Sequence, residues 1–235
     1  MILQYLMAFG IGLAPSIIWL VFFELEEREK PKRFSDLAFA FIAGSLTTFV
    51  ALLIQIYAAG QLGERGIDIH SVMGVSLFAT IEEVIKFLGV LLLVLSRKSF
   101  DEPLDAMIYM ISVALGFAAV ENIASLINSG AVATAFSSVK SIEVITLRFL
   151  GATLLHAVAS GVIGFHWAVG WVRHKLTWLH ILIGIIIACL LHTGFNILVL
   201  RFGPAGWALV FVAIIAFFVL VDFEELRTEE ERIKV

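Results

Sequence analysis

The sequence has one cysteine, four prolines and few charged residues, and each scarcity limits what the protein can be. Only 15% of its 235 residues are charged, whereas 60% are hydrophobic, and soluble domains have about 25% charged residues. The lone Cys189 excludes an intramolecular disulfide. Because no basic patch with interleaved aromatic residues is present, no nucleic-acid partner is expected. A mean hydropathy of +1.01 indicates a single integral membrane domain over residues 1–235, surrounded by membrane lipid.

Long apolar stretches account for most of the chain. A helix needs roughly 17–25 apolar residues to cross a bilayer, and seven stretches meet this requirement: 3–23, 37–59, 71–95, 106–128, 144–171, 179–200 and 205–221. The first has no basic region and no cleavage site, so we read it as a retained transmembrane helix. The sequence therefore predicts an all-α, polytopic transmembrane helix bundle. The connection at 129–143 includes an apolar stretch, 130–136, that is too short to span, and our hypothesis is that this connection gates lateral entry.

The distribution of lysine and arginine predicts the orientation of the chain. Most of these residues lie in the connections at 24–36, 96–105 and 173–178 and in the tail after 221. Cytoplasmic loops carry an excess of lysine and arginine. We therefore expect the N-terminus outside, the C-terminus in the cytoplasm, and a multi-pass protein of the cell membrane.

Ionisable side chains at membrane depth occur on four consecutive predicted spans. A charge at the bilayer centre costs roughly 2.5–3.5 kcal/mol on insertion scales, so such groups usually face a partner, a cavity or a substrate. The first, second and seventh spans have nothing comparable. The sequence therefore predicts one shared site, between the midplane and the extracytoplasmic side, formed by these residues: Glu82, Glu83, Lys86, Glu121, His156 and His192.

The spacing on the third span predicts different environments for its two glutamates. Glu82 and Lys86 are four residues apart and share a helix face, whereas Glu83 points about 100° away. Lys86 is therefore expected to be the structural counter-ion of Glu82. Glu83 would remain available, and which glutamate acts as the base stays open.

Two hydrolytic chemistries are compatible with these residues. In the first, a glutamate in a low-dielectric pocket activates water, and His192 and Asn196, four apart on one helix, donate toward a shared oxyanion. In the second, His156, His192 and Glu121 bind zinc as a catalytic His₂Glu set, and another glutamate is the base. Both routes end in hydrolysis of a carbonyl compound. The sequence leaves zinc and a metal-independent glutamate mechanism open.

The order of the polar motifs resembles that of the PrsW family of polytopic intramembrane proteases and, more distantly, the type II CAAX-prenyl endopeptidases. The motifs are Glu82-Glu83-x-x-Lys86, Phe117-x-x-x-Glu121-Asn122, His156, and His192-x-x-x-Asn196. The CAAX branch has an arginine and a histidine where this chain has Lys86 and Glu121, which favours PrsW.

The resemblance implies an endopeptidase that cuts membrane-anchored proteins near the outer membrane face, as PrsW-like proteins cut anti-sigma factors. It also implies that Glu82 and Glu83 are essential and that His192 and Asn196 polarise the scissile carbonyl. His156 and Glu121 would complete the site.

Two other functions remain alternatives. Intramembrane glutamate, histidine and lysine residues also relay protons, so the chain could be a proton- or ion-coupled transporter. It could also be a catalytically silent membrane scaffold. A compact cluster of the glutamates and histidines would favour the protease, whereas a continuous polar path to both faces would favour transport.

Overall fold

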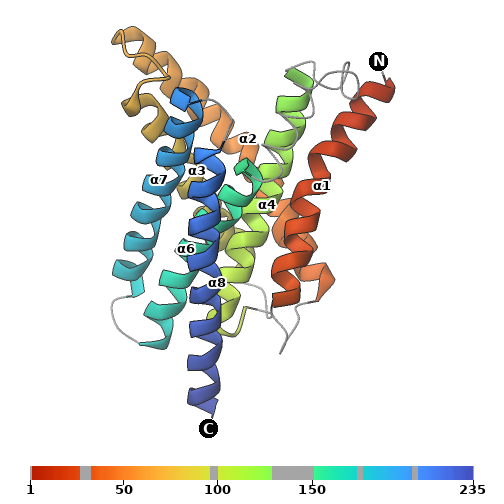
Figure 1. Cartoon of the computed structure of the whole chain (residues 1–235), viewed down its shortest axis with the longest axis vertical. Coiled ribbons are helices and arrows are strands. Elements are labelled where there is room, and N and C mark those ends of the chain that lie inside the picture. Colours follow the sequence, from red (N-terminus) through yellow and green to blue (C-terminus); the bar gives the residue numbers. More distant parts are fainter. Residues whose placement is uncertain are drawn as a thin grey trace.

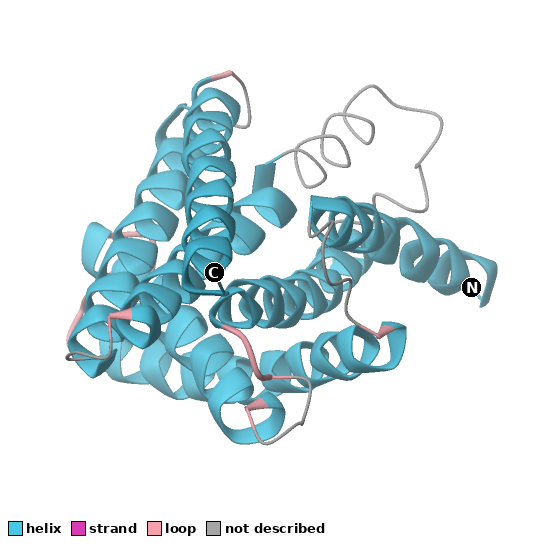
Figure 2. Cartoon of the chain, turned by 90° about the horizontal axis from the view of Figure 1, so that it is seen from below, coloured by secondary structure: helices cyan, strands magenta, loops and turns pink. Residues whose placement is uncertain are grey.

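The computed structural model describes residues 2–26, 33–95, 100–128, 151–173, 177–202 and 206–234. Within these ranges it contains helices and short loops and no strand (Figure 2). The helices are α1 (Ile2–Glu26), α2 (Phe34–Glu64), α3 (Val72–Gly89), α4 (Pro103–Asn128), α6 (Thr153–Val172), α7 (Thr177–Phe202) and α8 (Trp207–Lys234), and a short π-helix, η1 (Val90–Val94), continues α3. The two chain ends lie at opposite ends of the bundle (Figure 1).

The predicted all-α membrane bundle is confirmed. Among the described residues, six helices are long and apolar enough to cross a membrane: α1, α2, α4, α6, α7 and α8. The remaining helix, α3, is shorter and carries Glu82, Glu83 and Lys86. The chain is thus a multi-pass membrane protein. The inside–outside orientation stays a prediction, and the start of the fifth predicted span and the expected gate at 129–143 lie outside the described residues.

The core of the bundle is the packed pair α4 and α6. Every residue from Leu104 to Ala119 is buried, as is every residue from Thr153 to Gly164. A helix that is apolar on all sides belongs inside a bundle, and α4 packs against α1, α2 and α6. Gly164 permits the close approach of this pair, because a Cβ there would meet the backbone of Met107. The other helices surround this pair.

The backbones of α2 and α4 approach each other even more closely where these helices cross. A Cβ on Gly44 would collide with the carbonyl group of Val113, and one on Gly116 with that of Phe41. Ser45 Oγ also donates a hydrogen bond to the Gly116 carbonyl oxygen at 3.1 Å. Small residues and interhelical hydrogen bonds are the usual means of joining helices in membranes. This crossing fixes α2 beside the site.

A side-chain cap fixes the start of α3, the helix that carries the two glutamates. Ser71 is the N-cap of α3, and its Oγ accepts a hydrogen bond from the backbone N–H of Gly74 at 3.1 Å. Such a cap satisfies one of the free N–H groups of the first turn. Along its length α3 packs against α2 and α7. Its polar residues therefore lie in the middle of the bundle.

Candidate active site

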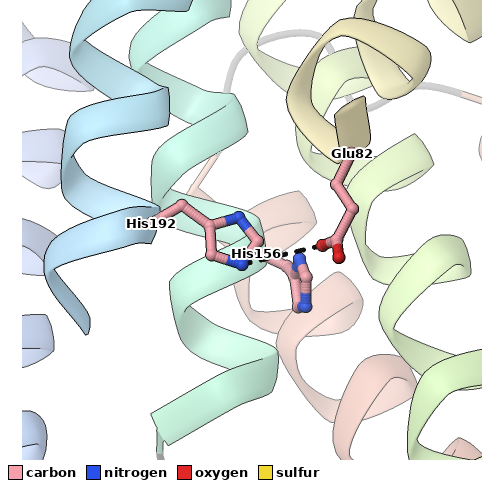
Figure 3. Close-up of side chains that lie close together, drawn as sticks. All are labelled: Glu82, His156 and His192. Atoms are coloured by element: carbon pink, nitrogen blue, oxygen red, sulfur yellow. Dashed lines mark ion pairs between the residues drawn. The ribbon is translucent and has the colours of Figure 1, made fainter. Parts of the chain in front are cut away.

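Three helices bring Glu82, His156 and His192 together inside the bundle. The side chains converge from α3, α6 and α7 (Figure 3). One ligand atom from each of the three lies within 4.8 Å of the others, and all three residues are buried. Their separation in sequence is large, so only packing of the helices creates this cluster. All three residues belong to the set that the sequence predicted for a shared site.

Glu83, the next residue of α3, is fully buried and enclosed by hydrogen-bond donors. Its Oε1 lies 2.7 Å from Lys86 Nζ and 2.7 Å from His192 Nδ1. Its Oε2 accepts a hydrogen bond from Ser160 Oγ at 3.3 Å. The side chains of Glu83 and Lys86 are both fully buried. Glu83 is therefore the residue that balances the charge of the lysine and orients His192.

The expected pairing of Lys86 with Glu82 is wrong, because Lys86 pairs with Glu83. Helix neighbours three and four residues away are both within reach, so the surrounding helices decide between them. Lys86 Nζ turns toward α6 and α4, where it lies 2.7 Å from His156 Nδ1 and 4.9 Å from the centre of the Phe117 ring. Glu83 lies on that side, whereas Glu82 faces α2 and α7.

Glu82 is incompletely satisfied. Its Oε1 accepts a hydrogen bond from Gln55 Nε2 on α2 at 2.8 Å. Its Oε2 is buried, has no hydrogen-bond partner among the described residues, and lies 3.6 Å from His192 Nε2. A buried carboxylate oxygen without a partner is costly. This oxygen is thus available to take up a proton, to accept a hydrogen bond or to coordinate a metal ion.

The contacts of the two histidines define their proton positions. Lys86 donates to Nδ1 of His156, so Nε2 of that ring carries its proton and donates to Glu121 Oε2 at 2.7 Å. His192 donates Nδ1–H to Glu83. A histidine whose one nitrogen donates to a carboxylate presents the other toward a metal or a substrate. His192 Nε2 is in that state and faces Glu82.

A cavity of about 740 Å³ gives access to these groups. Its wall includes turns of α2, the end of α4 and the start of α6, as well as Glu82 and His192. Phe49 and Leu52 contribute an apolar side. The polar side chains on its wall that bear on chemistry are Gln55, Glu82, Glu121, His156, His192 and Asn196. The cavity is large enough for a segment of peptide.

The cluster fits a metal ion in its donor types. A carboxylate and two imidazoles are the ligand set of catalytic zinc. The orphaned Glu82 Oε2 and His192 Nε2 can ligate without losing any described contact, whereas His156 would have to release Lys86 or Glu121. The structure groups Glu82, rather than Glu121, with the histidines. The expected set of His156, His192 and Glu121 therefore stays a prediction.

The predicted site residues divide into two groups. Glu82, Glu121, His156, His192 and Asn196 all line the cavity, whereas Glu83 and Lys86 lie behind it and are fully buried.

Two residues of the cluster, Gln55 and Ser160, were not predicted from the sequence. Gln55 interrupts an apolar run on the second span, which was expected to contribute nothing, and Ser160 follows His156 by one helical turn. Both were detectable as single polar residues at membrane depth. Asn122, which belongs to a predicted motif, instead joins α4 to α6 by donating to Thr153 Oγ1 at 2.8 Å.

The fold and the cluster define a class: multi-pass membrane proteins with a buried carboxylate–histidine centre beside a cavity. Within this class, the model of the PrsW family of intramembrane metalloproteases matches residues 32–222. The chain belongs to the PrsW family.

The curated relatives support this assignment. The chain is 31% identical to Protease PrsW of Geobacillus kaustophilus (strain HTA426) over 66% of its length, and 27% identical to Protease PrsW of Bacillus subtilis (strain 168) over 66%. These alignments cover 63% and 65% of the relatives' own lengths, somewhat less than two thirds. No solved structure matches the chain.

Proposed function

We propose that this chain is an intramembrane endopeptidase that hydrolyses a peptide bond of a membrane-anchored protein in the cavity beside Glu82. The observation that carries the proposal is Glu82 Oε2, which has no hydrogen-bond partner in the described part of the chain, is buried at the cavity wall and lies 3.6 Å from His192 Nε2. A buried carboxylate held close to a histidine is suited to abstract a proton from water. Family membership supports a protease in particular.

In this reaction Glu82 takes a proton from water, and the water oxygen attacks the scissile carbonyl carbon. His192 and Asn196, one turn apart on α7 and both on the cavity wall, are placed to donate to the resulting oxyanion. When the peptide C–N bond breaks, the proton held by Glu82 passes to the departing amine. His192 needs a proton on Nε2 for this donation, and Glu83 stabilises that charged form through Nδ1.

Zinc is the alternative means of activating the same water. Glu82, His156 and His192 would hold the ion, which would supply Lewis acidity and lower the pKa of a bound water. In that case His192 ligates through a neutral Nε2, and Glu83 fixes its tautomer. Glu121, whose side chain is 31% exposed and lines the cavity, is then the carboxylate placed to accept the proton.

The position of the site between membrane helices supports a membrane-anchored substrate. A cavity between membrane helices is reached most directly by a protein that is itself anchored in the membrane. By resemblance to PrsW proteins we assign a regulatory protein of the anti-sigma-factor type. The predicted orientation places cleavage between the midplane and the extracytoplasmic side.

The described core argues against a transport function. Beyond the cluster, α4 and α6 bury apolar side chains such as Met107, Ile111 and Ile163 against one another. A transporter needs a polar path that reaches both faces. The cluster instead has the compactness expected for a hydrolase.

Cleavage of a single-span reporter protein in lipid vesicles tests the proposal. The wild type, Glu82→Gln and a matched Glu64→Gln variant are compared, because Glu64 is an exposed glutamate at the end of α2. We expect cleavage by the wild type and Glu64→Gln and none by Glu82→Gln. Cleavage by Glu82→Gln, or none by the wild type with or without added zinc, would contradict the proposal.

Metal analysis of the same preparations separates the two mechanisms. Stoichiometric zinc in the wild type that disappears in His192→Ala and persists in Glu64→Gln would establish the metal route. Cleavage by a preparation without metal would establish that glutamate activates water unaided. A further variant, Glu121→Ala, tests whether Glu121 is a ligand or only the proton acceptor.

A further inference from the structure

One polar side chain on α2 stands apart from its surroundings. Beyond Ala51 the helix is lined by exposed apolar residues, including Leu52, Leu53, Ile56 and Tyr57. Gln55 lies among them and is only partly exposed. A glutamine amide loses hydrogen bonds to water when it enters a membrane, so it is expected to have a partner inside the protein. That partner is Glu82.

The contact between Gln55 and Glu82 is short and specific. Gln55 Nε2 donates to Glu82 Oε1 at 2.8 Å, from a different helix. An ionised carboxylate only accepts, so the amide nitrogen must face it. Since Oε1 is held in this way, the rotation of the carboxylate is set, and Oε2 is directed toward His192 Nε2.

The position of Gln55 is fixed by the backbone of α2. Gly44, Thr48, Ala51 and Gln55 recur at helical spacing and form one stripe of the helix. The stripe begins at the close crossing of Gly44 with α4, and Thr48 and Ala51 continue it as buried residues. Gln55 is the next residue of the stripe, and its side chain reaches Glu82 on α3. The close crossing with α4 therefore holds α2, and with it the Gln55 amide, in a fixed position.

We infer that Gln55 is a positioning residue of the catalytic centre: its amide fixes the Glu82 carboxylate so that Oε2 is presented to His192 and to the cavity. The inference rests on the proposed function. Carboxylates in active sites are commonly held by a second hydrogen bond, and removal of such a partner typically costs about 10–100-fold in metal affinity or activity. Without the amide, the carboxylate of Glu82 is free to rotate.

Replacement of Gln55 by methionine tests this role, because methionine keeps the length of the side chain, suits a lipid-facing position and has no donor. The matched control is Gln61→Met, on the same helix, since the amide of Gln61 donates to the exposed Glu64 at 3.4 Å. Both variants of the full chain are purified in detergent. Zinc affinity is measured with zinc alone, kcat and KM with the reporter, and folding by thermal unfolding.

We expect Gln55→Met to lower zinc affinity and kcat by about 10–100-fold with KM unchanged, and Gln61→Met to leave all three unchanged. In a Glu82→Gln background, Gln55→Met should cause no further loss of zinc affinity, because the two residues act as one unit. If the wild type cleaves without zinc, kcat alone is the readout.

Three results would contradict the positioning role of Gln55. Equal zinc affinity and kcat in Gln55→Met and Gln61→Met would overturn the positioning role while leaving the protease intact. A rise in KM alone would also overturn it, since Gln55 would then contact the substrate instead. A wild type that neither cleaves nor binds zinc would refute the proposed function itself, and this inference with it.

Discussion

The polar cluster has two halves that differ in their contacts although they meet at adjacent residues of α3. The closed half consists of Glu83, Lys86 and Ser160, all essentially inaccessible and joined by hydrogen bonds. The open half consists of Glu82 and Glu121, which line the cavity, and includes the orphaned Glu82 Oε2. His156 and His192 connect the halves, because each uses one nitrogen on either side.

The closed half is expected to stabilise the fold, whereas the open half is expected to carry out the reaction. In the closed half every described charge has its partner, so these residues hold the helices together and set the histidines. In the open half a carboxylate is kept in a state that costs free energy, and such sites persist where function requires them. Mutations in the open half are therefore expected to change activity, and mutations in the closed half are expected to change folding as well.

The largest effect is expected for Glu82→Gln. The change removes the base but keeps the shape of the side chain, and a general base contributes about 10²–10⁴-fold to a rate. We expect kcat for reporter cleavage to fall by at least that range. The thermal unfolding midpoint should stay equal or rise, because a poorly satisfied buried charge is lost. A large loss of stability would show that Glu82 belongs to the closed half.

The next effect is expected for Lys86→Met. The change leaves Glu83 as a buried carboxylate without its cation, and breaking such a pair costs about 3–5 kcal/mol. Thermal or denaturant unfolding in detergent measures this loss. The control is the double variant Glu83→Gln with Lys86→Met, which removes both charges.

The double variant should recover much of the stability lost in Lys86→Met, because no uncompensated charge remains. It should stay impaired in cleavage, since His192 and His156 lose the groups that orient them. Equal stability of the single and double variants would contradict the pairing of Lys86 with Glu83.

The smallest effect is expected for Ser160→Ala. The hydroxyl donates one hydrogen bond of 3.3 Å to Glu83, and interhelical hydrogen bonds in membranes average about 0.6 kcal/mol. Unfolding should shift by about that amount, and cleavage should remain near the wild-type rate. A loss of cleavage without a loss of stability would place Ser160 in the open half.

The predictability of the site varied from residue to residue. Glu121, His156 and His192 could be assigned to it from the sequence, because an ionisable group at membrane depth must face the interior whatever the details of packing. The partner of Lys86 could not be assigned, because two glutamates were within reach on the same helix. Gln55 was missed because it is uncharged and the prediction was built on the ionisable groups of the other spans, although a single polar residue at membrane depth was a detectable signal.

The amino-acid sequence by itself determined the long apolar helices of the described part of the chain and the set of polar residues available for a site. Both depend on local quantities: the hydropathy of a stretch and the cost of burying a charge in lipid. Only the tertiary structure decided which glutamate faces the cavity and which is enclosed. That choice depends on how α3 is rotated about its axis relative to α2, α6 and α7. Side-chain packing between segments distant in sequence fixes this rotation.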